Sequence, residues 1–335
     1  MSFNGNTYGS LSPRIGMYAV AKLLATAQPQ LVLDKFAQHV TLPKNHGMVV
    51  KFRRPVTFNP ATTELVEGVT PPPEIFEYED VAVRIRQYGA YVVFTDVVAD
   101  LHEDDVPKHI VKQLAEQVAT TRESITWNVL TAGTSVFYSG TATSRATVQA
   151  PITLNDINRA IRTLEKNFAK KITDFILPTV GVSTQAIRPA YILFGHTDLR
   201  QDFEAMTGYI PIENYSKHDK VSDYEIGAVR GVRIVLTPHY APLKGAGASP
   251  APSGVLSTGG AVDVYQCVIV GADAYGCVGL HNRHDAEVAL KMPKIGESIE
   301  DPLGLRGFAA WKMWYACVRL NEAWMTRIEC AASAL

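Results

Sequence analysis

The chain has 335 residues and a mass of 36.7 kDa, a length that suits one large domain or two modest ones. Its 32 lysines and arginines balance 33 aspartates and glutamates, and the net charge of −1 argues against a nucleic-acid binder of the basic-patch kind. Hydrophobic residues make up 47%, too many for a disordered chain, while the 19% of charged residues is below the usual share and indicates surface that contacts other subunits.

The N-terminal part of the chain divides into a polar arm, a helix and a strand. Residues 2–12 are rich in Gly, Asn and Ser, and they show neither the basic start nor the apolar centre of a secretory signal. Residues 14–27 turn to Ala, Leu, Met and Val, which predicts a helix that stops near Pro29. After a turn that contains Pro, Asn and Gly, residues 48–53 predict a strand.

Residues 55–83 form an unusual acidic segment. They contain six acids and no lysine or arginine, and five prolines interrupt regular structure. Basic residues flank the segment on both sides, and alternating apolar side chains predict a second strand over residues 81–94. Because so long a connection does not fit inside a compact domain, we expect the strands and their acidic tip to project as a hairpin arm towards a neighbouring molecule.

The strongest helix prediction covers residues 106–131. Apolar residues recur there at spacings of four and seven, and most charged residues, Glu123 among them, fall outside this stripe. The stripe consists of Val106, Ile110, Leu114, Val118, Ile125 and Val129. Pro107 suits the first turn and Gly133 lies just past the end. The helix is long for a globular protein.

A second helix is predicted to begin after Thr153, whose hydroxyl can cap it together with Asp156. Its apolar face consists of Ile157, Ile161, Leu164 and Phe168. Strands are predicted at residues 191–194, 232–236, 262–270, 274–280, 286–292 and 307–319, with a short helix at 198–206. A few helices followed by long meandering strands favour an α+β fold over alternating βαβ units.

The four cysteines lie in apolar stretches, with spacings of 10, 40 and 13 residues that match neither a zinc ribbon nor a redox pair. They are Cys267, Cys277, Cys317 and Cys330. We expect buried, reduced thiols that act as small apolar side chains, in a protein of cytoplasmic origin.

Two histidine clusters offer possible metal ligands. His102 with the acids that follow it, and His109, stand at the start of the long helix, where acids favour the positive end of the helix dipole. His281 and His284 suit a polar turn between two strands, and no distant third ligand accompanies them.

Two further motifs also favour structural roles. Gly271 and Gly276 have the separation of a phosphate-binding loop, but Cys277 follows where lysine should stand, which favours a hairpin turn. An aromatic set favours packing in the core or between subunits over stacking on bases; it consists of Trp311, Trp314, Tyr315 and Trp324. We therefore assign no catalytic, metal-binding or cofactor-binding residue, expect no cofactor, and predict that the chain is not an enzyme.

Several short pieces of the chain occur in the order found in a known protein family. They are Leu42-Pro43-Lys44-Asn45-His46-Gly47 with Lys51-Phe52-Arg53-Arg54, Leu65-Val66-Glu67-Gly68-Val69-Thr70-Pro71, Gln87-Tyr88-Gly89-Ala90-Tyr91-Val92 with Thr95-Asp96, Asp198-Leu199-Arg200, Glu225-Ile226-Gly227 and Gly231-Val232-Arg233. In this order they resemble the major capsid protein of tailed bacteriophages, and more narrowly a capsid family of short-tailed phages. The resemblance spans residues 11–240, and the remaining third fits through its strand pattern.

The resemblance implies the Hong Kong 97-type phage capsid fold. It places an N-terminal arm and helix at residues 1–47 and an extended loop, or E-loop, at residues 48–95. A peripheral domain would comprise residues 96–179 and 306–335, with a spine helix at 104–131, and an axial domain would comprise residues 180–305.

The resemblance also implies a structural function. Copies of the chain would self-assemble into pentamers and hexamers of an icosahedral phage head that encloses double-stranded DNA without sequence-specific binding and without a membrane. The near-neutral charge suits this role, because a basic inner wall would hold the genome and hinder its ejection. We expect the protein in the virion, assembled in the bacterial host cytoplasm. Expected partners are a portal protein, a separate scaffolding protein, because the long helix begins too early for a cleaved scaffold domain, and a decoration protein.

Two alternatives remain open at this stage. One is the shell of an encapsulin-like cellular compartment with the same fold, which would need a pocket that docks cargo. The other is a metal-dependent hydrolase centred on His281 and His284.

Overall fold

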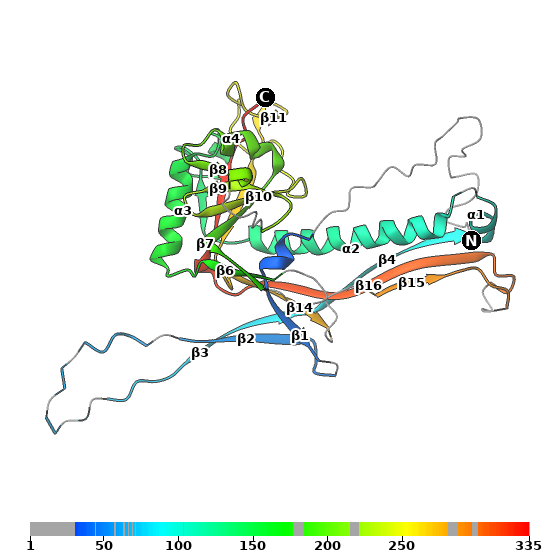
Figure 1. Ribbon diagram of the computed structural model, residues 1–335, viewed down its shortest axis with the longest axis horizontal. Coiled ribbons are helices and arrows are strands. Elements are labelled where there is room, and N and C mark those ends of the chain that lie inside the picture. Colours follow the sequence, from blue (N-terminus) through cyan, green and yellow to red (C-terminus); the bar gives the residue numbers. More distant parts are fainter. Residues whose placement is uncertain are drawn as a thin grey trace.

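The computed structural model describes residues 31–334, apart from residues 44, 57, 63, 66, 69, 71 and 103 and the segments 177–183, 215–220, 281–286 and 297–300. For residues 174–176, 184–188 and 287 it describes the backbone alone. The predicted polar arm and the helix at 14–27 lie outside the described residues. Figure 1 shows a body built on one sheet, a long layer of sheet and helix that extends from it, and a hairpin arm that projects the other way.

An eight-stranded sheet forms the body. Its order is β5 (Val136–Tyr138), β17 (Met325–Cys330), β13 (Tyr265–Val270), β7 (Thr184–Gly195), β10 (Val232–Leu236), β9 (Glu225–Val229) and β8 (Tyr209–Pro211), and β6 (Ile172–Ile176) also pairs with β7. Helix α3 (Leu154–Lys166) packs against β5 and β17, and the short helix α4 (Arg200–Glu204) contacts β8. Along β7, Ile192 and Phe194 enter one core cluster and Tyr191 and Leu193 enter another, so the sheet is covered on both faces.

A five-stranded sheet and the longest helix form the extended layer. The strands are β1 (Gln38–Leu42), β14 (Tyr275–Leu280), β16 (Arg306–Arg319) and β15 (Glu287–Lys291) in that order, and β4 (Arg86–Thr95) also pairs with β16. Helix α2 (Val106–Thr131) runs along one face over β16, and α1 (Asp96–Leu101) precedes it at the far end, away from the body (Figure 1). Alternate residues of β16 (Ala309, Trp311, Met313) are buried in the core that contains the buried residues of α2.

The smaller elements complete the fold. Strands β11 (Ser257–Thr258) and β12 (Ala261–Val262) form a short hairpin. Single turns of 3-10 helix are η2 (Leu33–Phe36), η3 (Arg145–Thr147), η4 (Thr197–Leu199), η5 (Ile212–Asn214) and η6 (Glu322–Trp324).

The arm consists of β2 (Val49–Pro55) and β3 (Tyr78–Arg84), which pair antiparallel from Val49 opposite Arg84 to Pro55 opposite Tyr78. The predicted hairpin is therefore confirmed. The prediction of one strand over residues 81–94 is wrong: the chain divides it at Ile85, which is buried at the base of the arm, and continues as β4 in the five-stranded sheet.

The ends of α2 match the predicted residues 106–131. Asp105 caps the N-terminus by accepting a hydrogen bond from the Lys108 N–H (3.3 Å), and Pro107 occupies the first turn.

Among the described residues no helix, α2 included, is long and apolar enough to cross a membrane.

The buried face of α2 differs from the predicted stripe. Leu114 and Val118 are buried as predicted, but Arg122, Glu123 and Thr126 are buried as well. The prediction that Glu123 lies off the buried face is wrong, because its carboxylate accepts hydrogen bonds inside the protein. A periodicity of apolar residues does not reveal a charged side chain that has partners in the core.

Leu114→Ala is expected to lower the free energy of unfolding by about 2–5 kcal/mol, because Leu114 is 4% exposed and its removal leaves a cavity between α2 and the sheet. Urea unfolding followed by circular dichroism measures the loss. Lys112→Ala, at an exposed position on the same helix, is the control and should change the value by less than about 0.5 kcal/mol. Equal unfolding midpoints for the two variants would contradict the burial of Leu114.

Helix α3 begins as predicted and ends differently. Thr153 and Asp156 form the predicted capping box, with Asp156 N–H donating to Thr153 Oγ1 (3.4 Å) and Thr153 N–H to Asp156 Oδ2 (3.1 Å). Ile157 and Leu164 are buried on its apolar face, but the placement of Phe168 on that face is wrong. The helix ends at Lys166, and Phe168 lies in the following turn with its ring exposed.

Two predictions at the C-terminal strands have different outcomes. All four cysteines are buried and free, as predicted, and Cys277 lies opposite Cys317 on neighbouring strands. The predicted hairpin turn at Gly271 is wrong, because β13 and β14 belong to different sheets. A Cβ at Gly271 would lie 2.8 Å from the Lys170 carbonyl oxygen, so the close approach of two backbones explains this glycine.

The strands of the expected domains divide between the two sheets. Within residues 180–305, β7 to β10 and β13 join the eight-stranded sheet, whereas β14 and β15 join the five-stranded sheet. Strand β5 and helix α3, expected in the peripheral domain, lie at the eight-stranded sheet, as does β17. Strand pairing is set by contacts distant in sequence, which the pattern of one strand does not contain.

Candidate interaction surfaces

The stem of the arm is closed by ion pairs between its own strands. Arg53 Nε donates to Asp80 Oδ1 (2.8 Å) and Arg53 Nη2 to Asp80 Oδ2 (3.1 Å), while Arg54 Nη2 donates to Glu79 Oε2 (2.6 Å). The hydrogen bonds from Arg53 lower the pKa of Asp80. These residues face each other in register, so two of the bases that flank the acidic segment are already paired within the arm.

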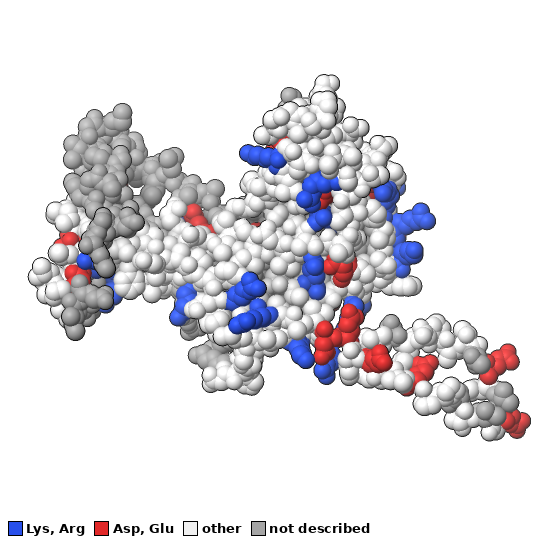
Figure 2. All heavy atoms as spheres, turned by 180° about the vertical axis from the view of Figure 1, so that it is seen from behind, with Lys and Arg blue, Asp and Glu red and all other residues white. Residues whose placement is uncertain are grey.

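The connection between β2 and β3 is acidic and apolar at once. Four of the six acids remain on it, namely Glu64, Glu67, Glu74 and Glu77, and none of them is in an ion pair within the described part of the chain. Large apolar side chains beside them are exposed, including Phe58, Leu65, Ile75 and Phe76. The rings of Phe58 and Phe76 lie 5.9 Å apart, yet neither enters a core cluster of this subunit. Figure 2 shows the acids along the projecting arm.

Within the residues that the structure describes, the arm packs on its own subunit at its base. Val50 and Phe52 of β2 and Val83 of β3 pack with Ile85 against β14 and β16, in a small core cluster separate from the two larger ones. Because exposed apolar patches of this kind mark interaction sites, the arm is a candidate contact with another molecule.

A second exposed apolar surface lies at the far end of the extended layer. It consists of Val97, Leu101, Met292, Ile295, Leu303 and Leu305. Asp301 fixes the backbone here by accepting hydrogen bonds from the N–H groups of Leu305 (3.0 Å) and Arg306 (2.9 Å), and these bonds lower its pKa. The two ends of the molecule thus each carry exposed apolar side chains.

Residues 32–36 are fastened to α2 by buried charged groups, a contact we call the clasp. Arg122 Nη2 lies 2.7 Å from Asp34 Oδ2, and the Leu33 N–H donates to the Glu123 carboxylate (3.2 Å). The Tyr240 hydroxyl, from the loop after β10, donates to the same carboxylate (2.7 Å). Arg122 and Glu123 are each 3% exposed, so the clasp joins the N-terminal segment, α2 and the body inside the protein.

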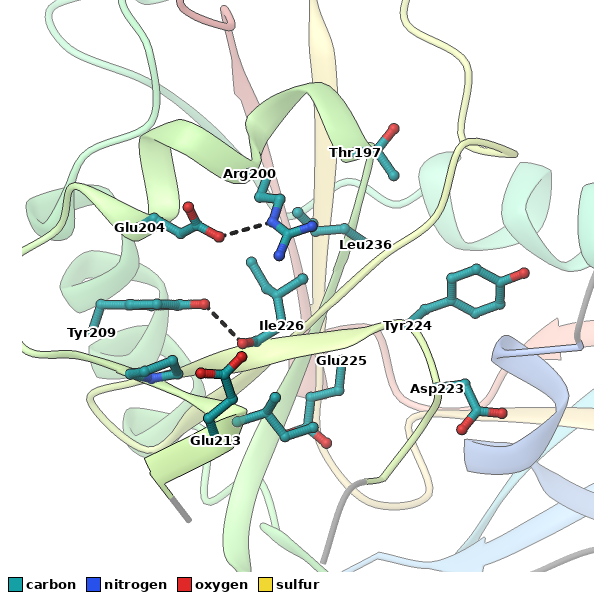
Figure 3. Close-up of a pocket in the computed structure, with 12 residues that line it drawn as sticks. Thr197, Arg200, Glu204, Tyr209, Glu213, Asp223, Tyr224, Glu225, Ile226 and Leu236 are labelled. Carbon is teal, nitrogen blue, oxygen red and sulfur yellow. Dashed lines mark hydrogen bonds and ion pairs between the residues drawn. The ribbon is translucent and has the colours of Figure 1, made fainter. Parts of the chain in front are cut away.

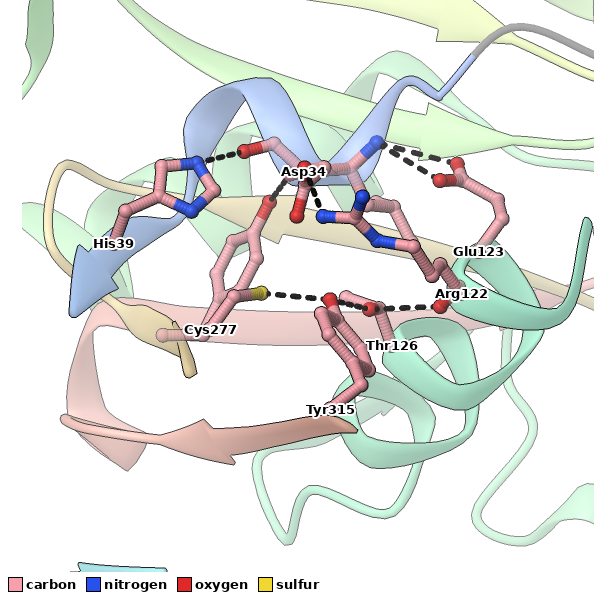
Figure 4. Close-up of polar contacts among 9 residues, drawn as sticks. Asp34, His39, Arg122, Glu123, Thr126, Cys277 and Tyr315 are labelled. Atoms are coloured by element: carbon pink, nitrogen blue, oxygen red, sulfur yellow. Dashed lines mark hydrogen bonds and ion pairs between the residues drawn. The ribbon is translucent and has the colours of Figure 1, made fainter. Parts of the chain in front are cut away.

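Hydroxyl groups extend the clasp into the five-stranded sheet (Figure 4). The Tyr275 hydroxyl donates to the Leu33 carbonyl (2.5 Å), and the Tyr315 hydroxyl bonds Thr126 Oγ1 (2.8 Å) and Cys277 Sγ (3.0 Å). Buried hydrogen bonds between different elements favour one arrangement of those elements.

Burial raises the pKa of Glu123 to about 7, although hydrogen bonds from Tyr240 and Leu33 favour its charged form; the charge of Asp34 raises it further. The pKa of Glu123 is higher in the folded protein than in the unfolded chain. The contribution of Glu123 to the free energy of unfolding is therefore fully present below the unfolded pKa and is lost as the pH rises through 7. We therefore expect the free energy of unfolding to fall by about 2 kcal/mol between pH 5 and pH 8 through Glu123.

Glu123→Gln keeps the hydrogen-bond acceptor and removes the charge, so it should flatten this pH dependence relative to the wild type. Urea unfolding at a series of pH values measures the difference. Glu116→Gln, the same change on the same helix outside the clasp, is the control. A parallel pH profile for Glu123→Gln and wild type would show that Glu123 does not titrate in this range.

A groove of ≈ 520 Å³ lies beside α4 and β9 (Figure 3). Arg200 Nε donates to Glu204 Oε1 (2.8 Å) and the Tyr209 hydroxyl to the Ile226 carbonyl (2.8 Å), so these polar atoms have partners within the wall. In the described lining, no serine, cysteine or threonine nucleophile stands beside a histidine base.

The histidine candidates have different outcomes. His281 and His284 lie outside the described residues. In the first cluster, the Asp104 N–H donates to His102 Nδ1 (3.1 Å) and Asp105 caps α2. Across the ranges the structure describes, no three potential metal-ligating side chains gather.

The aromatic set packs as predicted. Trp311 and Tyr315 are buried in the main core, and Trp314 and Trp324 pack against core clusters.

The feature that sequence reasoning missed is the clasp. Its signal was the four-residue spacing from Leu114 and Val118, which continues through Arg122.

Comparisons with known proteins agree with this architecture. A family model described as phage capsid protein matches residues 78–327. The "Major capsid protein" of Pseudomonas phage KPP21 is 24% identical over 265 residues, which cover 74% of this chain and 67% of the relative.

Solved structures show the same fold at low sequence identity. The capsid of Ralstonia phage GP4 has a TM-score of 0.71 at 11% identity, with 99% of both chains covered. The head structure of Helicobacter pylori bacteriophage KHP40 has a TM-score of 0.65 at 12% identity, covering 99% of this chain and 98% of that one. The chain therefore belongs to the phage capsid protein family, as a phage major capsid protein with the Hong Kong 97-type fold.

Proposed function

We propose that copies of this chain assemble into pentamers and hexamers of an icosahedral head that encloses double-stranded DNA. The observation that carries the proposal is the arm: its base packs in its own subunit, while its acids and large apolar side chains remain outside every core cluster. A closed shell offers a neighbour to each such arm. Membership of a structural capsid family points to a non-enzymatic role in the virion.

We further propose that the domains follow the sheets. The eight-stranded sheet with α3 and α4 corresponds to the axial domain, and the five-stranded sheet with α2 to the peripheral domain. The E-loop then comprises β2, β3 and their connection, because β4 already belongs to the five-stranded sheet.

Partners of this shell follow from the same proposal. A portal protein at one vertex, a separate scaffolding protein and a decoration protein are the expected ones, with assembly in the cytoplasm of the bacterial host. The packaged DNA would be held without base-specific contacts, and the net charge of −1 agrees with such weak binding.

Electron microscopy of particles purified with and without phage DNA tests the proposal. Closed icosahedral shells with five-fold and six-fold clusters, and DNA protected from nuclease in the virion, are the expected results. Shells that form in cells, enclose an enzyme and exclude DNA would indicate a cellular compartment instead. A chain that stays monomeric alone and with a scaffolding protein would contradict self-assembly.

A further inference from the structure

The chain leaves α3 through a backbone conformation that phenylalanine rarely adopts. Phe168 has a φ of +53°, in the left-handed region that favours glycine. The Phe168 N–H donates to the Glu165 carbonyl (3.0 Å) and the Ala169 N–H to the Leu164 carbonyl (3.0 Å). This is the Schellman pattern of helix ends, in which the left-handed position is usually glycine. A phenylalanine there costs conformational free energy that glycine would not.

The turn after α3 is held in place by side chains from other elements. Asn167 Nδ2 donates to the Ala323 carbonyl (3.2 Å), and Trp324 Nε1 donates to the Asn167 carbonyl (3.1 Å). The Tyr191 hydroxyl donates to the Ala169 carbonyl (3.0 Å). The backbone that carries the phenylalanine ring is therefore fixed, and the ring is presented at a defined place on the surface.

Phe168 gains no burial within the subunit in return. Its side chain is 87% exposed, the highest value among the large apolar side chains that the structure describes. Arg162, Lys166 and Lys170 are exposed beside it along the chain, and neither Arg162 nor Lys166 has an ion-pair partner among the described residues. We call this group of four residues the Phe168 knob: one aromatic ring with three cations.

We propose that the Phe168 knob is the docking site for the arm tip of a second copy of this chain. The inference rests on the proposed function and names one contact within the shell. The tip carries acids without a base, and its exposed Leu65, Ile75 and Phe76 match the ring. Figure 2 shows acids along the arm and Lys and Arg side chains along the margin of the body above it.

The composition of the Phe168 knob suits the centre of a protein–protein interface. Aromatic side chains and arginine that lose water on contact often dominate binding free energies, and opposite charges around them set the register. Apolar contact with Phe168 would exclude water from the surrounding cations and strengthen their attraction to the tip's carboxylates.

Packaged DNA matches the knob less well. Aromatic side chains bind nucleic acid by stacking on unpaired bases, which double-stranded DNA does not present. Cations alone would suffice to bind the phosphates of DNA. The exposed ring of Phe168, on a backbone conformation that is unfavourable for phenylalanine, would then have no role.

Phe168→Gly is the first test, made in the full chain. Glycine suits the left-handed position, so the unfolding temperature of unassembled subunits should stay the same or rise, while the yield of closed particles on sedimentation should fall about tenfold or more. Arg230→Gly is the control, because Arg230 is also exposed with a positive φ (+51°) but lies in another turn. It should leave the particle yield unchanged.

A charge exchange then identifies the partner. Lys166→Glu with Lys170→Glu should block assembly, and adding Glu67→Lys with Glu74→Lys should restore it by at least about tenfold.

Wild-type particle yields from both Phe168→Gly and the Lys166→Glu, Lys170→Glu variant would overturn the inference. So would blocked assembly that the tip exchange fails to restore, because the partner would then be another surface. Normal shells that lose only packaged DNA would assign the knob to DNA. Failure of the wild-type chain to form particles would refute the proposed function instead.

Discussion

Replacing Asp34 with alanine is expected to destabilise the subunit by about 3 kcal/mol, because it removes the carboxylate that lies 2.7 Å from the buried Arg122 guanidinium. The cost arises from the charge that stays in the core after its counter-charge is gone. The same change removes one of the contacts that hold residues 32–36 on α2, so amide exchange in this segment should become faster. Urea unfolding and amide hydrogen exchange over residues 32–42 measure both effects.

Two comparisons make this result specific to the buried clasp. Glu79→Ala removes a carboxylate that lies 2.6 Å from Arg54 on the exposed arm, and it should barely change the free energy of unfolding. The double variant Asp34→Leu with Arg122→Met should lose less stability than Asp34→Ala, because it leaves neither member of the ion pair buried without the other. If Asp34→Ala and Glu79→Ala behaved alike, the clasp would contribute no more than a surface pair.

Reversing the charge of the arm tip is expected to abolish assembly while leaving the fold intact. Glu64→Lys, Glu67→Lys and Glu74→Lys change three exposed residues that lie outside every core cluster, so the thermal unfolding of the subunit should match the wild type. Each exposed pair at a subunit contact contributes only about 0.2–1 kcal/mol. A closed shell repeats the contact at every subunit, so the sum is large, and added salt should weaken it.

Sedimentation of the triple variant beside a circular dichroism melt measures both parts of this prediction. The neutral variant with glutamine at the same three positions separates charge from shape, and it should assemble better than the lysine variant. Wild-type shells from the lysine variant would show that the tip's charge has no part in assembly. An unfolded variant would show that the arm belongs to the core.

Much of the secondary structure could be predicted because its signals are local. The limits of α2 follow from Pro107 at its start, from Gly133 past its end and from its apolar spacing, and the start of α3 follows from the capping box. The acidic segment between two strands predicted the arm, because no compact packing accommodates it. In each case the residues that determine the structure lie within one continuous segment of the chain.

What could not be predicted depends on contacts between distant residues. The sequence near Gly271 resembles a hairpin turn, yet the strands on either side enter different sheets. Glu123 looks solvent-facing until Leu33 and Tyr240, 90 and 117 residues away, supply its hydrogen bonds. Phe168 continues an apolar spacing, but the helix ends two residues earlier at Lys166 and the ring turns outward.

The pairing of α2 with β16 has a mechanical consequence. The helix has 26 residues and spans about 39 Å, the strand has 14 residues and spans about 46 Å, and neither is interrupted. A load applied at the far end is therefore carried along two continuous, hydrogen-bonded elements that are joined through a shared core. A wall built from such units would yield under internal pressure at the joints between subunits before any one subunit bends.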